Sequence, residues 1–269
     1  MEGVTVDDGA PIGIFDSGFG GLTVARVIVD QLPGENILYL GDTARAPYGP
    51  RPIAEVRRYA LACLDTLVDM DVKALVIACN TASAAVLADA RERYDIPLVE
   101  VILPAARRAV RVSRTREIAV LCTQATATSG AYDDAVAATG AHLTTIVCPR
   151  FVEFVEAGIT GGDELLAVAE SYLAPVRGAA VDTVILGCTH YPLLSGVISY
   201  VLGPEVTLVS SAEECANATY SSLAREHRLR RGDDGSRRFL TTGNPDRFAR
   251  IGTRLLGAAI NTEQVKVEV

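Results

Sequence analysis

Short runs of apolar residues alternate along the chain with longer stretches in which apolar residues recur at the helical period. The runs in the first part of the chain predict strands over 12–15, 36–40, 74–78 and 97–102. The stretches between them predict helices over 21–31, 53–70 and 81–94. An alternation of this kind is typical of an α/β protein.

The same alternation returns in the second part of the chain. Strands are predicted over 117–121, 143–147, 182–187 and 205–209, again with helices between them. A final strand over 237–242 and a helix over 246–259 complete the pattern. Because strands that are apolar throughout are buried on both faces, the sequence predicts parallel sheets covered by helices.

The two parts of the chain also align with each other. Asp16 in IFDS aligns with Cys122 in AVLCT, and Cys79 in IACNT aligns with Cys188 in LGCTH, at nearly the same offset. Such self-similarity indicates an internal duplication. We therefore expect two similar parallel-sheet α/β domains with the active site in the cleft between them. One domain is expected from residues 1–101 plus 211–269, completed by the C-terminus, and the second from 102–210.

Charge and hydropathy argue against some classes of protein. The net charge of −8 disfavours a nucleic-acid surface, and the basic segment 225–238 is interrupted by acids and glycines. No unbroken apolar run approaches the roughly 18 residues that a membrane-spanning helix needs. The first ten residues, MEGVTVDDGA, lack the basic start and apolar core of a signal peptide. We expect a soluble cytoplasmic protein without membrane or direct nucleic-acid partners.

Cysteine and lysine usage narrows the chemistry. The six cysteines include no C-x-x-C pair, so neither a zinc ribbon nor a thioredoxin-type site has local support. Cys63 and Cys215 are expected to be buried apolar residues. The two lysines, Lys73 and Lys266, lie just ahead of a strand and near the C-terminus, unlike a lysine that binds pyridoxal phosphate.

Four residues with reactive side chains follow predicted strands: Asp16, Cys79, Cys122 and Cys188. In parallel α/β sheets, ligands bind beyond the carboxyl ends of the strands, so these side chains are expected to face a cleft.

Helices are predicted to begin directly after two of these thiols. Asn80, Thr81 and Thr189 are therefore candidate N-caps. Because the positive end of a helix dipole favours a thiolate, we expect the pKa of Cys79 and of Cys188 to be lowered.

Three neighbouring segments complete the expected cleft. FDSGFGGLTV (15–24) does not fit G-x-G-x-x-G, but its glycines suit a backbone that lies close to a small ligand. TARAPYGPRP (43–52) is a stiff loop that carries Tyr48 and Gly49 to the cleft edge. CTQATATSG (122–130) is a hydroxyl-rich turn of the type that binds carboxylates or phosphates at a helix N-terminus.

The two thiols are compatible with three kinds of chemistry. A zinc site of Cys79, Cys188 and His190 lacks a pair of closely spaced ligands. A cysteine protease needs one thiol and leaves the second without a role. A racemase that works without a cofactor needs two bases on opposite sides of one carbon, with the carbanion stabilised by positioned N–H and O–H donors.

The sequence resembles the glutamate racemases of the aspartate/glutamate racemase family. The blocks GIFDSGFGGLTV, YLGDTARAPYG, IACNTASA and LGCTHYPLL stand in that family's order and spacing, and the likeness runs from about Ile12 to about Thr242. The resemblance implies interconversion of L- and D-glutamate without cofactor or metal. It also implies a role in supplying D-glutamate for peptidoglycan, and hence in cell-wall biogenesis and cell shape.

The resemblance assigns roles residue by residue. Cys79 and Cys188 are the paired acid and base, assisted by Asp16 and His190 respectively. The implied substrate-binding residues are Asp16, Ser17, Tyr48, Gly49, Asn80, Thr81, Thr123, Thr126, Glu156, Thr189 and His190. One departure is visible, because the segment that usually begins Gly-Thr reads Cys122-Thr123 here. The resemblance further implies a homodimer, and some family members bind DNA gyrase.

Two other functions remain compatible with the sequence. One is a racemase or isomerase of the same superfamily that acts on aspartate or hydantoins. The other is a carboxylate-binding or partner-binding protein that keeps the fold without catalysis, against which the presence of both thiols argues.

Overall fold

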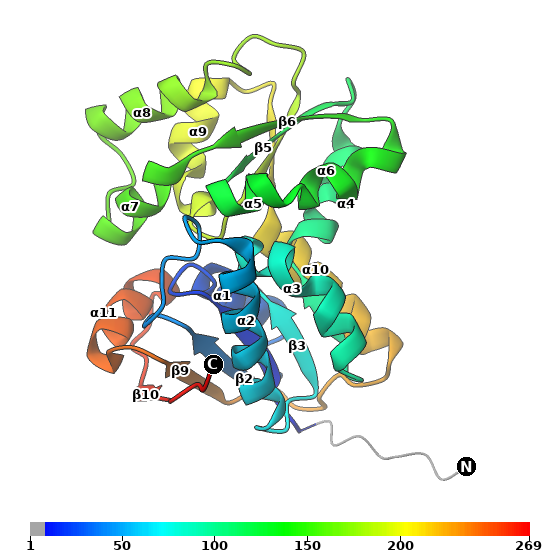
Figure 1. Ribbon diagram of the computed structural model, residues 1–269, viewed down its shortest axis with the longest axis vertical. Coiled ribbons are helices and arrows are strands. Elements are labelled where there is room, and N and C mark those ends of the chain that lie inside the picture. Colours follow the sequence, from blue (N-terminus) through cyan, green and yellow to red (C-terminus); the bar gives the residue numbers. More distant parts are fainter. Residues whose placement is uncertain (1–8) are drawn as a thin grey trace.

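The computed structural model describes residues 9–269. It contains two parallel β-sheets with helices packed on their faces (Figure 1). Every strand pairing in these residues is parallel. Residues 1–8, on which the expected lack of a signal peptide mainly rests, lie outside the described residues. No helix within 9–269 is long and apolar enough to cross a membrane.

The larger sheet has six strands and the smaller has four. The larger has the order β10-β9-β2-β1-β3-β4, with bounds Thr262–Gln264, Arg237–Thr241, Ile37–Gly41, Ile12–Asp16, Ala74–Ile77 and Leu98–Glu100. The smaller has the order β6-β5-β7-β8, with bounds His142–Val147, Glu117–Cys122, Thr183–Gly187 and Thr207–Ser210. The order β2-β1-β3-β4 thus recurs as β6-β5-β7-β8. The predicted α/β fold with two similar parallel sheets is confirmed.

Helices join the strands. They are α1 Leu22–Gln31, α2 Ile53–Val68, α3 Asn80–Arg93, α4 Ile102–Val112, α5 Gln124–Ser129, α6 Ala131–Val136, α7 Pro149–Ala157, α8 Asp163–Leu173, α9 Ser195–Leu202, α10 Ser211–Arg225 and α11 Pro245–Leu256. Two 3₁₀ turns, η1 Ala137–Thr139 and η2 Tyr191–Leu194, complete the elements in the described part of the chain.

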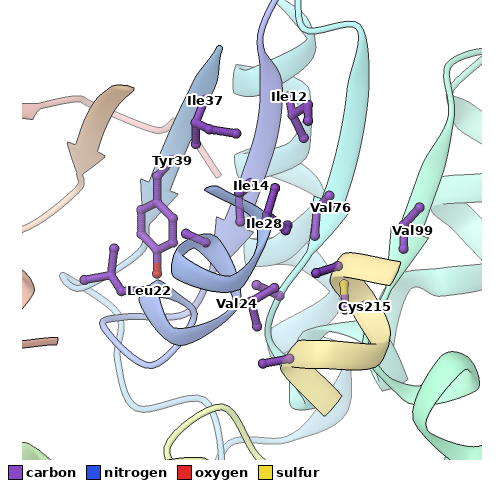
Figure 2. Close-up of a cluster of buried hydrophobic side chains, with 14 of the residues drawn as sticks. Ile12, Ile14, Leu22, Val24, Ile28, Ile37, Tyr39, Val76, Val99 and Cys215 are labelled. Atoms are coloured by element: carbon purple, nitrogen blue, oxygen red, sulfur yellow. The ribbon is translucent and has the colours of Figure 1, made fainter. Parts of the chain in front are cut away.

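Alternate residues of each strand point to opposite faces, and both faces of each sheet are buried. One face of the larger sheet packs against α1, α10 and α11, and Figure 2 shows Ile14, Tyr39 and Val76 on this face. The other face packs against α2 and α3. The smaller sheet lies between α4 and α6 on one side and α7, α8 and α9 on the other. Cys215 and Cys63 are fully buried on the two faces of the larger sheet, as predicted.

The structure differs from the sequence prediction in three elements. The strand predicted over 97–102 ends at Glu100, because the apolar residues that follow begin α4. The short polar strand β10 was not predicted, since its sequence TEQ has no apolar run. A 3₁₀ turn precedes α9 where the sequence suggested that an α-helix begins straight after Cys188.

Candidate active site

The reactive side chains lie at the ends of equivalent strands in the two sheets. Asp16 ends β1 and Cys122 ends β5, and each of these strands lies between two neighbours in its sheet. Cys79 and Cys188 follow β3 and β7, which occupy equivalent places beside them. The carboxyl ends of the two sheets therefore supply all four residues, as parallel α/β topology favours.

Both Cys79 and Cys188 line one cavity of about 230 Å³. Their side chains are almost enclosed, at 6% and 7% exposure. The other lining residues are Ser17, Gly18, Ala46, Pro47, Tyr48, Gly49, Pro50, Asn80, Thr81, Thr123, Gln124, Pro149, Val152, Glu153, Glu156, Thr189 and His190. Residues that are far apart in the sequence thus meet around one small space.

Most of the predicted site residues lie on this cavity, but two lie behind its wall. Asp16 is 1% exposed and is not among the lining residues. Thr126 is equally buried and reaches the cavity only through the hydroxyls of Thr81 and Thr123. Cys122, the departure noted in the sequence, is fully buried and packs on the α4–α6 face of its sheet, away from the cavity lining.

Cys79 is itself the N-cap of α3. Its backbone is still extended, and its Sγ accepts a hydrogen bond from the amide of Ala82 at 3.4 Å. The thiol also contacts the hydroxyl of Ser17, with 3.4 Å between Sγ and Oγ. The expectation that Asn80 or Thr81 caps this helix was therefore wrong, because the helix begins one residue earlier than predicted and the thiol takes the capping place.

The acidity of Cys79 also differs from the expectation. Burial raises the pKa of this thiol to about 12, and the nearby Asp16 adds to the shift. The hydrogen bond with Ser17 and the amide of Ala82 act in the opposite direction but do not outweigh burial. Cys79 is therefore a protonated thiol at neutral pH, and the expected lowering of its pKa by the helix N-terminus is wrong.

Cys188, His190 and Glu156 form a chain of contacts on the other side. The Nδ1 atom of His190 lies 3.7 Å from the Sγ of Cys188, and its Nε2 lies 3.5 Å from the Oε1 of Glu156. Burial alone disfavours a charged ring, but the contacts with Cys188 and Glu156 raise the pKa of His190 to about 10. The same contact with His190 lowers the pKa of Glu156. An imidazolium therefore lies between a thiol and a carboxylate.

Asp16 occupies the corresponding position behind Cys79. Its Oδ2 accepts a hydrogen bond from the amide of Gly18 at 2.8 Å. Burial raises the pKa of this carboxyl, while backbone amides and the charge of His190 oppose the shift. Asp16 thus lies close enough to affect both Cys79 and His190 electrostatically.

The glycine-rich loop after β1 packs directly against the Cys188 side. A side chain at Gly20 would place its Cβ 2.2 Å from the hydroxyl of Thr189 and 2.6 Å from Nδ1 of His190. The hydroxyl of Thr23 donates a hydrogen bond to the carbonyl of Thr189 at 2.9 Å. Thr189 therefore contacts the opposite loop rather than capping a helix, and the glycine makes this approach possible.

Three threonine hydroxyls form a closed triangle at the cavity. Thr81 and Thr123 are 2.9 Å apart, Thr81 and Thr126 are 3.2 Å apart, and Thr123 and Thr126 are 3.1 Å apart, each measured between Oγ1 atoms. Thr81 lies in the first turn of α3, and Thr123 is the N-cap position of α5. Hydroxyls at the starts of two helices thus converge, an arrangement that suits an anionic group.

Tyr48 is held in place by a carboxylate that the sequence analysis did not single out. Its hydroxyl donates to Oδ2 of Asp42 at 2.5 Å, and Asp42 is fully buried. Arg45 and Thr242 bind the other oxygen of Asp42. Asp42 follows β2, so the rule that led to Asp16 and the cysteines also points to it.

Other cavity residues were missed because no local motif marks them. Gln124, Pro149 and Val152 line the space, but none of them carries an acid, a base or a nucleophile that would have singled it out. Glu153 lines it together with Glu156, so both acids of that helix reach the cavity. Tyr132 lies behind Asn80, and its hydroxyl accepts a hydrogen bond from the Asn80 side chain.

Neither lysine lies on the cavity, and the described residues hold no cluster for a metal. Lys73 precedes β3, at the amino end of the strand, and its Nζ lies 2.6 Å from Oε2 of Glu35. Lys266 forms an exposed pair with Glu268. Among residues 9–269, no group of three or more His, Cys, Asp or Glu side chains is placed to hold a metal ion.

Known proteins resemble this chain over nearly its whole length. A family model described as Asp/Glu/hydantoin racemase matches residues 12–219. A glutamate racemase of Parafrankia sp. (strain EAN1pec) is 64% identical over 260 residues, covering 96% of this chain and 94% of that protein. A glutamate racemase isoform of Bacillus anthracis is 40% identical, with a TM-score of 0.93 over 96% of this chain and 98% of its own. The glutamate racemase of Francisella tularensis, solved in complex with D-glutamate, is 32% identical, with a TM-score of 0.91 over 97% of this chain and 99% of its own.

Proposed function

Because the chain belongs to the Asp/Glu/hydantoin racemase family, we propose that it interconverts L- and D-glutamate, with Cys79 and Cys188 as paired acid and base. The observation that carries the proposal is that two thiols from equivalent strand ends line one small cavity. A binding protein needs neither thiol, and a single-thiol hydrolase needs one. Two thiols around one space suit a carbon that loses a proton on one face and gains one on the other.

The reaction moves one proton off the substrate and another onto it. A thiolate at one cysteine takes the proton from Cα and becomes a thiol. The electron pair of the broken C–H bond stays on the substrate as a carbanion, delocalised into the α-carboxylate. The thiol at the other cysteine then gives its proton to the opposite face of Cα and becomes a thiolate. The reverse reaction exchanges the two roles.

The surroundings of the two thiols differ in a way that fits this exchange. Burial keeps Cys79 protonated, which is the form that delivers a proton. For Cys79 to act as the base it must first lose its own proton, and Asp16 is the nearby carboxylate proposed to receive it. On the other side the imidazolium of His190, held by Glu156, places a positive charge against the Cys188 thiol.

The substrate is proposed to bind through groups that suit its two carboxylates. The hydroxyls of Thr81 and Thr123 and the N-termini of their helices offer donors for one carboxylate. Ser17, Gly49 and Thr189 offer further backbone and side-chain donors around the cavity. Since the carbanion forms in an enclosed site, such fixed donors stabilise it more than water does.

The proposal includes no cofactor and no metal. Pyridoxal phosphate needs a lysine for its Schiff base, and Lys73 lies in an ion pair at the amino end of β3. Supply of D-glutamate for peptidoglycan in the cytoplasm and assembly as a homodimer follow from the family resemblance and belong to the same proposal.

The direct test is racemisation of L-glutamate in buffer containing a metal chelator and no pyridoxal phosphate. In D₂O each enantiomer should yield the opposite one with solvent deuterium at Cα, and product that keeps its original proton would contradict two separate bases. Parallel assays with L-aspartate and a hydantoin identify a different substrate within the family.

Variants of the thiols test the assignment. C79A and C188A should each lower racemisation by at least roughly 10³-fold while the unfolding midpoint stays close to that of the unmodified protein. C63A is the matched control, because Cys63 is also a buried cysteine but lies on the buried side of α2, outside the cavity lining. Unchanged turnover in C188A would remove the mechanism.

A further inference from the structure

Tyr132 is a buried tyrosine that bridges the two halves of the structure. It lies on α6 beside the smaller sheet, is 2% exposed and packs against Cys122 and Ile185. Gly187, at the end of β7, leaves room for its ring, since a Cβ on that glycine would lie 3.1 Å from Cε2 of Tyr132. The ring therefore reaches past the carboxyl end of β7 toward α3, the helix that connects β3 and β4 of the larger sheet.

The hydroxyl of Tyr132 meets Asn80 at the first turn of α3. The Nδ2 of Asn80 donates a hydrogen bond to this hydroxyl at 2.8 Å. Asn80 lines the cavity and is 3% exposed. Its Oδ1 is buried and has no hydrogen-bond partner among the described residues. One end of the amide is thus anchored, and the other is a buried acceptor with its bonding capacity unused.

The anchored amide has a definite chemical preference. A side-chain amide is planar, so as long as Nδ2 donates to the Tyr132 hydroxyl, Oδ1 lies on the other side of the amide carbon. A buried acceptor without a partner is costly, and a ligand that supplies a donor removes that cost. Glutamate carries one strong donor, its α-ammonium group, while both of its carboxylates are acceptors.

We propose that Tyr132 is a positioning residue that orients the Asn80 amide so that Oδ1 accepts a hydrogen bond from the substrate ammonium. This inference rests on the proposed function, because it deepens the account of the same cavity. Without the Tyr132 hydroxyl the amide can turn over and present Nδ2 instead, and a donor facing an ammonium is repulsive. Tyr132 therefore contributes to selection of an amino acid over a plain dicarboxylate.

The test compares two ligands and two tyrosines. Y132F removes one oxygen and keeps the ring. Y94F is the matched control, because Tyr94 lies at the other end of α3 and its hydroxyl also donates to a side chain, Asp65, at 2.7 Å. Binding of glutamate and of glutarate, which has the same two carboxylates and no amino group, is measured by calorimetry for each variant.

Y132F should weaken glutamate binding, and raise its KM, about tenfold, while glutarate binding changes less than twofold. Y94F should change neither. Equal weakening of both ligands in Y132F would show that Tyr132 only supports the packing and would overturn the proposal, as would unchanged glutamate binding.

A second pair of variants tests the Asn80 side separately. N80A should show the same preference, losing glutamate binding and keeping glutarate binding, and uniform loss would overturn the proposal. In N80D both side-chain oxygens are acceptors, so orientation no longer matters. The N80D/Y132F variant should therefore bind glutamate as N80D does, and a further tenfold loss would contradict positioning through the amide. Racemisation by the unmodified protein tests the proposed function independently of these binding ratios.

Discussion

The imidazole of His190 lies against the thiol of Cys188, with 3.7 Å between Nδ1 and Sγ. The opposite nitrogen of the ring lies 3.5 Å from the carboxylate of Glu156. Together these contacts raise the pKa of the buried ring to about 10, although burial acts against its charge. A positive group thus remains beside this thiol over the physiological pH range. The negative charge of Glu156 can therefore be removed by mutation to test how far it supports the charge of His190.

Replacing Glu156 with glutamine should lower the pKa of His190. The amide keeps the shape and a hydrogen-bonding oxygen but removes the negative charge that favours the imidazolium. We expect the pKa to fall by roughly one unit or more, and the alkaline limb of the kcat–pH profile to move down with it. NMR titration of the three histidines measures the shift, with exposed His142 as an internal control. An unmoved His190 resonance would contradict the ion pair.

The same pair predicts how stability depends on pH. The folded-state pKa of His190 lies above its ordinary value of 6.5, so the folded protein binds more protons than the unfolded chain between that value and about 10. Its contribution to the free energy of unfolding is fully present below pH 6.5 and is lost as pH rises toward 10. Urea unfolding at pH 6 and 9.5 should show a fall of a few kcal/mol that is smaller in H190Q. An equal fall in both proteins would exclude His190 as its source.

Gly20 should not tolerate a side chain. The Cβ of alanine at this position would meet the Thr189 hydroxyl and the His190 ring at 2.2 and 2.6 Å, so the loops of the two sheets must separate. We expect G20A to reduce kcat/KM by about 10² or more, since a misplacement near 1 Å has that effect. G196A is the control, because its Cβ on α9 meets nothing within 4 Å and should raise stability slightly. Equal activity of the two variants would contradict the close approach.

Much of the fold could be predicted from the sequence, because strands buried on both faces leave continuous apolar runs. The same strands, read to their carboxyl ends, led to Asp16, Cys79 and Cys188. Elements that depend on other parts of the chain were missed. Strand β10 is polar and exists through its pairing with β9, which no local pattern reveals.

The details of the site show the same limit. Cap preferences pointed to Asn80, whereas the cavity side of α3 is capped by a thiol. The helix dipole predicted an acidic Cys79, but burial, which depends on the whole fold, dominates. Tyr132 contacts Asn80, and Asp42 contacts Thr242, through hydrogen bonds between distant segments of the chain. The division into residues 1–101 plus 211–269 and 102–210 stays a prediction.

Lys73 should matter for stability and not for catalysis. Its side chain is fully buried, its Nζ lies 2.6 Å from Glu35 and donates to the carbonyl of Arg228 at 2.7 Å, all at the end of the sheet opposite the cavity. Removing one partner of a buried ion pair leaves an uncompensated charge, so K73M should lower the free energy of unfolding by about 3–5 kcal/mol. The K73M/E35Q variant should recover part of that loss. Urea unfolding and kcat measure the two effects, and a tenfold fall in kcat of folded K73M would contradict the assignment.

Alkylation distinguishes the cavity thiols from the enclosed ones. Cys79 and Cys188 border the cavity, whereas Cys63, Cys122, Cys148 and Cys215 are fully buried and lie outside its lining. Iodoacetamide should therefore modify Cys79 and Cys188 in the native protein, and peptide mass spectrometry locates the label. Because burial raises the pKa of Cys79 to about 12, its labelling rate should increase up to at least pH 10, roughly in proportion to the thiolate fraction. Glutamate should slow labelling of both thiols if it lies between them. Protection of one thiol alone, or equal labelling of Cys122, would contradict the arrangement of the two thiols around a shared ligand.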